Sequence, residues 1–329
     1  MSFKLISPSK EKWNDFVDSN IRSSVFQRHE MCDVYSKTKN MEGIRLAVSD
    51  EHGKILACMV IRLESKKFLK PLTSVSIIEN APLYEDSEQG KKAAEFIIRH
   101  YGRFIRRKAL YSNVKIDRNS FLEKLYESEG YEKTACLNFE IRLDRDPEKV
   151  FMQIHKSRRK NIRKTAKLGI DIIDSNESSL PDFYSLLKET YSKLGLLVPD
   201  ISFFYAAFEL MQPNVKMFLA RYKGEFIAGR IEIVYRKKIF DWYAGASSLH
   251  LNLFPNDAMV WHVLEYGCKN GCELFDFGGA GVADEEYGVR EFKKRFGGQL
   301  VEYSSFKKIH RPVIANLGSR FLSVCRKIF

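Results

Sequence analysis

The stretch from residue 275 to residue 298 holds the residues that are best suited to chemistry. It reads FDFGGAGVADEEYGVREFKKRFGG: a short apolar strand, a glycine-rich loop with three acids, and a short basic helix that stops at two glycines. Glycine loops that follow strands are a common place for ligands in α/β proteins. The pair Lys293–Lys294 beside Phe292 offers cations to an anionic group. We therefore expect a ligand site here.

A second candidate is the segment 147–168, which predicts one long helix ending at Gly169. Seven Lys or Arg residues fall within twelve positions, and no acid occurs from Phe151 to Ile170. Like charges at this density repel one another along a helix, so an anionic ligand or solvent ions must relieve them. Two interpretations of this helix stay open: it binds phosphate, or it is a solvated basic face. The cations assigned to tRNA or phosphate are Lys156, Lys160, Arg163, Lys164 and Lys167.

The composition of the 329-residue chain agrees with an anionic partner. The net charge is +12, and residues 151–329 contribute +8 of it, from 27 basic against 19 acidic residues. Nucleic acid, a phosphorylated substrate and an anionic membrane surface all fit, as does a basic surface that only aids solubility. The scattered cysteines and histidines show no ligand spacing, so we expect no metal. With no apparent signal segment or membrane span, we expect a cytoplasmic protein.

The elements that position these residues are predicted to occur twice. Each half reads β-α-α-β-β-β-α-β-α-β, which predicts two α/β domains with mixed sheets, at 1–145 and 146–310. The basic helix 147–168 links them. A basic amphipathic helix, 311–329, is expected to pack on the first domain, with a membrane-surface role as the weaker reading. This element order is that of the GNAT acyltransferase fold.

Several strings resemble the Fem family of peptidyltransferases. They are HKSRRKNIRKTAKLGI from residue 155, WYAGASS from 242, NGCELFDFGG and EFKKRFGG near the end, and IIENAPLYED from 77 in the first half. The BioF-like acetyltransferase domains share the closing motif. The resemblance implies tandem GNAT-like domains, aminoacyl-tRNA as donor and a cell-envelope precursor as acceptor. It implies no resident cofactor, and we favour a monomer, either in the cytoplasm or at the inner membrane face.

Aminolysis of an ester needs a neutral amine, two aligned reactants and a stabilised oxyanion. The resemblance assigns the oxyanion or a phosphate to Lys293 with Phe292, and the acceptor to Tyr243. It makes Glu85 or Asp86 a proton acceptor. The remaining substrate-binding candidates are Arg158, Arg159, Lys193, Asp276, Gly278 and Gly279. Arg158 or Arg159 would meet a phosphate through its bidentate fork, and Asp276 would organise the loop backbone or orient a partner.

Two departures from known patterns keep other functions open. Lys193 stands where the Fem family usually has arginine, and lysine cannot form the same bidentate fork. The pyrophosphate loop of coenzyme A-dependent GNAT enzymes is absent, which weakens an acyl-CoA donor without excluding it. The alternatives are therefore an acyl-CoA-dependent N-acyltransferase acting on an amino sugar or small amine, and a nucleic-acid-binding protein that uses the helix 147–168.

Overall fold

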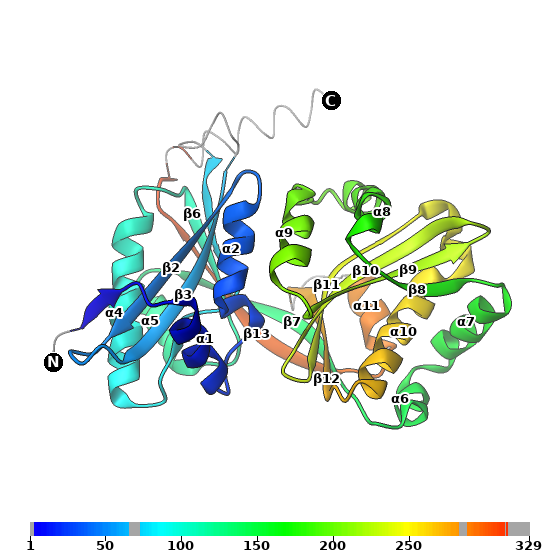
Figure 1. Ribbon diagram of the computed structural model, residues 1–329, viewed down its shortest axis with the longest axis horizontal. Coiled ribbons are helices and arrows are strands. Elements are labelled where there is room, and N and C mark those ends of the chain that lie inside the picture. Colours follow the sequence, from blue (N-terminus) through cyan, green and yellow to red (C-terminus); the bar gives the residue numbers. More distant parts are fainter. Residues whose placement is uncertain (1–2, 66–72, 283–287, 313, 315–329) are drawn as a thin grey trace. The chain divides into compact units, whose positions relative to one another are not determined.

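The computed structural model describes residues 3–65, 73–282, 288–312 and 314 (Figure 1). Its contacts divide the chain into unit 1, Met1–Ala135 with Tyr303–Phe329, and unit 2, Cys136–Glu302. The chain passes into unit 2 within β7 (Glu132–Arg142) and returns to unit 1 within β13 (Gln299–Ile309). The sequence places this division at 145/146 and assigns β13 to the second domain. The difference arises because β13 pairs with β6 (Tyr111–Ile116).

Unit 1 is a mixed sheet in the order β1-β2-β3-β4-β6-β13, with β5 on β3. Its other strands are β1 (Lys4–Ile6), β2 (Met41–Ser49), β3 (Ile55–Glu64), β4 (Val75–Ile78) and β5 (Leu83–Tyr84). Its helices are α1 (Lys10–Ser19), η1 (Val25–Gln27), α2 (His29–Lys37), α4 (Glu88–Ile105) and α5 (Ser120–Ser128). Helices α4 and α2 lie on opposite sides of β2 and β3 (Figure 1). Apolar residues of α4 and the strands form the core of this unit.

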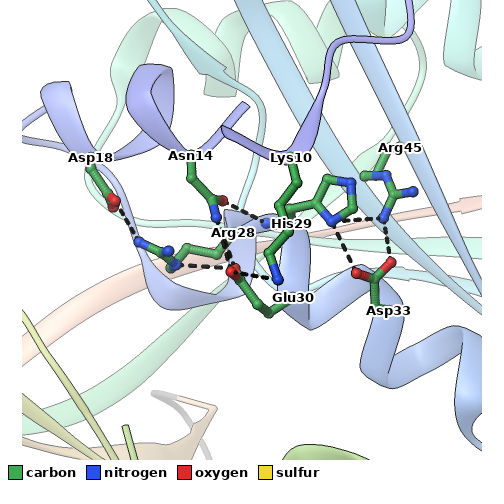
Figure 2. Close-up of polar contacts among 8 residues, drawn as sticks. All are labelled: Lys10, Asn14, Asp18, Arg28, His29, Glu30, Asp33 and Arg45. Carbon is green, nitrogen blue, oxygen red and sulfur yellow. Dashed lines mark hydrogen bonds and ion pairs between the residues drawn. The ribbon is translucent and has the colours of Figure 1, made fainter. Parts of the chain in front are cut away.

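A network of polar side chains ties α1 to α2 and β2 (Figure 2). Asn14 accepts from the His29 N–H and donates to Glu30 at 2.9 Å. Burial opposes the charge of Glu30, yet hydrogen bonds from its backbone, Arg28 and Lys10 lower its pKa to about 2. In the same network, Asp33 accepts from Arg45 at 2.6 Å and lies 2.9 Å from His29. Because these groups satisfy one another, the network holds the helices and offers little to a ligand.

Unit 2 is a second mixed sheet in the order β7-β12-β11-β10-β9-β8. Its strands are β8 (Asp171–Ser175), β9 (Val215–Tyr222), β10 (Glu225–Tyr235), β11 (Lys238–Ala246) and β12 (Leu274–Val282). Its helices are α6 (Pro147–Gln153), α7 (Lys156–Lys167), η2 (Glu177–Ser179), α8 (Leu180–Lys193), α9 (Ser202–Leu210), η3 (Ser248–Leu253), α10 (Pro255–Lys269) and α11 (Gly288–Lys294). Helix α8 packs on one face of β10 and β11, where Gly245 leaves room for its backbone. Helix α10 covers the other face and forms the main core with it (Figure 1).

The structure corrects three local predictions. The helix predicted over 147–168 is two helices, because Ile154 is extended and His155 caps α7 while donating its N–H to Arg295 O. The segment GGAGV, predicted as loop, continues strand β12. The sequence predicts a helix from Asn256 to Asn270 with Asn256 as its N-cap, but α10 starts at Pro255, after Phe254 with φ 58°, and Asn256 lies inside it. The acids 284–286 and nearly all of the predicted helix 311–329 lie outside the described residues.

Candidate active site

The site begins where two parallel strands of unit 2 separate. Strands β11 and β12 pair over only three residues, from Lys238 with Leu274 to Phe240 with Asp276. Beyond this point β11 stays with β10, and β12 stays with β7 through two register shifts. Backbone groups on the facing edges then lack ladder partners, so other donors and acceptors must satisfy them. Such carboxyl ends of parallel strands are where α/β proteins bind ligands.

Lys293 lies at this separation and is almost fully buried. Helix α11 carries it over β12, and its Nζ donates to Phe277 O at 2.5 Å and to Gly279 O at 2.9 Å. Only 9% of the residue is exposed. Burial lowers its pKa, while Asp241 opposes this shift. A lysine ammonium carries three donors, of which two are engaged with β12; the third has no hydrogen-bond partner among the described residues and can serve a further acceptor.

A cluster of buried charges lies near Lys293 on β10 and β11. Arg230 Nε donates to Glu232 at 3.0 Å, and the same guanidinium pairs with Asp241. Glu232 is completely buried, and its Oε2 has no hydrogen-bond partner among the described residues. Burial, followed by the nearby Asp241, raises the pKa of Glu232. Perturbed ionisable groups of this kind concentrate at functional sites.

This cluster is absent from the residues predicted from the sequence, although the sequence carries a signal for it. Arg230 and Glu232 stand two residues apart in the otherwise apolar run IAGRIEIV. Side chains two apart in a strand point to the same face, so the pair interrupts a face that should be buried. Charged residues are rarely buried without partners, which would have predicted an ion-pair partner on a neighbouring strand.

Asp276 organises the turn of β12 that precedes the Lys293 contacts. It accepts from Asn138 Nδ2 at 2.6 Å and from the Gly278 N–H at 2.9 Å, and it pairs with Lys238 at 2.7 Å. Gly278 has φ +69°, a conformation that suits glycine. Gly279 is exposed and presents its carbonyl to Lys293. These contacts place Asp276, Gly278 and Gly279 together, as a support for the site.

Arg158 and Phe292 meet at the start of α7, where both are partly buried. Arg158 Nη1 bonds both carboxylate oxygens of Asp257, at 3.1 and 3.2 Å, and its guanidinium lies 4.6 Å from the centre of the Phe292 ring. Asp257 is 3% exposed and also accepts from Asn161. Phe292 packs on the core and on Phe296. One nitrogen of the guanidinium predicted to bind phosphate is thus engaged by an internal carboxylate, and Phe292 has the contacts of a core aromatic.

Three other substrate-binding candidates lie elsewhere in unit 2. Tyr243 joins an aromatic cluster on the α8–α9 side, with its ring 5.0 Å from that of Phe204. Lys193 is exposed and pairs with Glu189 at 3.0 Å. Arg159 contacts the Met152 sulfur near the α6–α7 junction. Glu85 and Asp86 belong to unit 1, where they pair with Lys54 and Arg22 respectively.

Helix α7 presents the basic face that its sequence predicts. Lys156, Lys160, Arg163, Lys164 and Lys167 are all exposed. Arg163 lies over the Phe151 ring and Lys164 over the Phe254 ring. Within the described part of the chain, none of these five cations forms an ion pair with an acid. The face therefore remains strongly positive and available to an anionic polymer.

The described residues contain neither a cluster of metal ligands nor a helix suited to span a membrane. No group of three or more His, Cys, Asp or Glu side chains is arranged to hold a metal ion there. None of the helices in that part of the chain combines the length and apolar character that crossing a membrane requires.

Comparisons with known proteins agree with this architecture. Residues 153–294 match the Acetyltransferase (GNAT) domain family. The lipid II:glycine glycyltransferase of Staphylococcus haemolyticus is 18% identical over 230 residues, which cover 49% of this chain and 55% of that protein. Its namesake from Staphylococcus saprophyticus is 28% identical over 98 residues, covering 29% and 24%. The chain thus matches about half of the first relative's length and about a quarter of the second's.

Solved structures share the fold over nearly the whole chain. The crystal structure of FemX has a TM-score of 0.71 at 15% identity, covering 95% of this chain and 99% of that one. A tandem GNAT protein from the clavulanic acid biosynthesis pathway has a TM-score of 0.65 at 8% identity, covering 94% and 99%. The chain therefore has the predicted tandem GNAT-type α/β fold. Together with the glycyltransferase relatives, this confirms the predicted resemblance to the Fem family and supports the acyltransferase class.

Proposed function

We propose that this protein is a Fem-type N-acyltransferase that moves an aminoacyl group from aminoacyl-tRNA to an amine of a peptidoglycan or other cell-envelope precursor. The observation that carries the proposal is the buried Lys293 at the separation of β11 and β12, within a chain similar to lipid II glycyltransferases. With tRNA as donor the reaction takes place in the cytoplasm, and at the inner membrane face if the precursor is lipid-linked.

The reaction requires little of the protein beyond binding and charge stabilisation. The acceptor amine attacks the ester carbonyl, the new C–N bond forms, and the ester C–O bond breaks to release the tRNA hydroxyl. The amine loses one proton and the departing oxygen gains one. The third N–H of Lys293 is suited to the oxygen of the tetrahedral intermediate, because its position is fixed by the carbonyls of Phe277 and Gly279. The Arg230–Glu232–Asp241 cluster sets the electrostatic environment of that ammonium, because Asp241 and Glu232 favour its charged form and Arg230 disfavours it.

The basic face of α7 supplies a surface for the tRNA backbone. Its exposed cations suit phosphates, whose contacts supply much of the affinity for nucleic acid. We expect Lys160→Glu with Arg163→Glu to weaken tRNA binding and to reduce the salt slope by about one per lost phosphate contact. Lys188→Glu with Lys223→Glu changes the charge equally on other exposed positions of unit 2 and is the matched control. If this variant loses RNA binding but keeps its full transfer activity, α7 takes no part in the reaction.

An acyl-CoA donor is the second candidate, because residues 153–294 match an acetyltransferase family. To distinguish the two donors, the protein and a muropeptide amine are incubated with either charged tRNA or acyl-CoA. Formation of the new amide is followed by mass spectrometry. We expect the amide to form from charged tRNA. Product from acyl-CoA alone would refute the proposed donor and favour an acyltransferase acting on an amino sugar or small amine.

A further inference from the structure

Unit 1 also carries a basic surface, at the point where the C-terminal half of α4 faces the end of β13. A cavity of about 560 Å³ lies there. Another of about 500 Å³ adjoins it and shares Arg99 and Arg103. We call this surface the α4 groove and define it by Arg99, Arg103, Arg106, Lys308 and His310. None of these residues takes part in the site of unit 2.

The charges of the α4 groove are only partly balanced. Glu129 accepts from Arg99 at 3.1 Å, and its backbone carbonyl accepts from Lys308 Nζ. Arg103 and Arg106 are exposed, and no acid among the described residues pairs with either of them. Residues 99, 103 and 106 follow one another at helical i,i+4 and i,i+3 spacing, so their positive charges repel. An anion bound between them would remove this repulsion.

Cations near the C-terminal end of a helix also stabilise its dipole, which gives Arg103 and Arg106 a structural role as well. The backbone oxygens of Arg106 and Arg107, just beyond the end of α4, accept from the Arg311 guanidinium. Among the described residues, the side chains of Arg103 and Arg106 form no hydrogen bond with these carbonyls. Both residues line the groove, and a guanidinium presents a fork of donors that matches phosphate oxygens.

A buried chain of hydroxyl groups fixes His310 at the edge of the groove. His310 Nε2 lies 2.7 Å from Ser112 Oγ, which lies 2.6 Å from the Tyr101 hydroxyl, and that hydroxyl lies 2.7 Å from Ser76 Oγ. Burial, with the cations of Lys308 and Arg311, lowers the pKa of His310 to about 4. The ring is therefore held in one orientation and is neutral at physiological pH, and a nearby anion would raise its pKa.

We propose that the α4 groove binds the phosphate group of an anionic ligand, held by Arg103 and Arg106 with Lys308 beside them. The phosphate belongs either to a small phosphorylated compound or to a nucleic-acid backbone, since both present the same oxygens to a guanidinium fork. The site lies in unit 1 and does not depend on the transferase function.

The test is a calorimetric titration of the full chain with inorganic pyrophosphate and, separately, with a short single-stranded RNA. The RNA titrations are made with Lys160→Glu and Arg163→Glu present in every protein compared, so that α7 does not contribute to the binding. We expect the protein with an intact groove to bind at least one of the two ligands. Arg103→Glu with Arg106→Glu should weaken that binding by roughly 10- to 100-fold, the range for a lost charge-assisted contact. Lys12→Glu with Lys124→Glu makes the same charge change on exposed positions of unit 1 and should leave the affinity unchanged.

The two ligands also identify the source of the phosphate. Binding of pyrophosphate that the Arg103/Arg106 variant loses indicates a small phosphorylated compound, and loss restricted to RNA indicates a nucleic-acid backbone. A ligand bound in the groove should also raise the pKa of His310, followed by the NMR signal of its ring proton, in the wild type but not in the variant. No binding of either ligand, or equal affinity in the wild type and the variant, would overturn the proposal.

Discussion

Replacing Lys293 with methionine tests the role of the buried ammonium most directly. Methionine keeps the length of the side chain but removes the donors that serve Phe277 O and Gly279 O. The carbonyl of Phe277 is buried, and a buried carbonyl left without a donor costs about 1–3 kcal/mol, whereas Gly279 is exposed and its carbonyl can bind water instead. Removing a buried cation offsets part of this cost, because burial itself disfavours the charge. We therefore expect a net destabilisation of about 1–2 kcal/mol.

The neighbouring Lys294 provides the matched control for this experiment. Its side chain is 67% exposed and lies 3.9 Å from Glu291. We expect Lys294→Met to change the free energy of unfolding by less than about 0.5 kcal/mol, as is usual for exposed positions. Urea unfolding of both variants and the wild type measures this difference. Equal stability of all three proteins would show that Lys293 does not serve the two carbonyls as we describe.

The rate of transfer separates the catalytic role of Lys293 from its structural one. Losing one oxyanion donor lowers kcat by about 10²–10³. The measurement is made at a temperature where both variants are folded, so that a loss of rate cannot come from unfolding. If Lys293→Met transfers at the wild-type rate under these conditions, the assignment of Lys293 to the developing negative charge is wrong.

The same variant has a signature in the pH dependence of stability. Because the pKa of Lys293 is lower in the folded protein, the unfolded chain binds more protons at pH values just below the usual lysine pKa. The stability of the wild type should therefore rise with pH across that interval. In Lys293→Met this part of the rise should disappear, and an unchanged slope of the urea midpoint against pH would contradict the burial of a charged Lys293.

Three further substitutions test the surroundings of the site. Because the pKa of Glu232 is raised, the folded wild type keeps a proton on this residue above the usual glutamate pKa, and its stability should decline as the pH rises there. Glu232→Gln should remove this decline, as measured by urea midpoints at several pH values. Asp257→Ala should cost about 3–5 kcal/mol in unfolding free energy, since it leaves Arg158 partly buried and unpaired, and a loss below 1 kcal/mol would refute this. Gly297→Ala should lower the melting temperature far more than Gly271→Ala, since both have positive φ but only Gly297 would place a Cβ 2.6 Å from a backbone oxygen, that of Gln153; equal shifts would contradict this reading.

Much of the order of elements could be predicted because its signals are local. The turn at Lys223–Gly224 joins β9 and β10, with φ of 49° and 88°, and Gly271 ends α10 with φ 71°. Apolar periodicity predicts helices at Ser87–Arg107 and Ser179–Leu194, close to the observed bounds of α4 and α8. The exposed basic face of α7 also follows from its sequence alone, since a helix with so many cations cannot bury them.

The remaining features depend on partners that are distant in the sequence. The break between α6 and α7 is stabilised by Arg295, whose carbonyl accepts from His155, and no local pattern identifies that acceptor. The glycine run after Phe277 continues as a strand because β7 pairs with it. Arg158 looked free to bind phosphate, yet Asp257 of α10 holds its guanidinium.

The order of the elements, the turns and the resemblance that points to an acyltransferase thus follow from local sequence patterns. Which charges are buried and paired follows from the tertiary fold, because burial and ion pairing depend on contacts between distant segments. The stretch from residue 275 to residue 298 illustrates both kinds of information. Its lysine pair was visible as a pattern, but the packing of α11 on β12 buries Lys293 and leaves Lys294 in solvent.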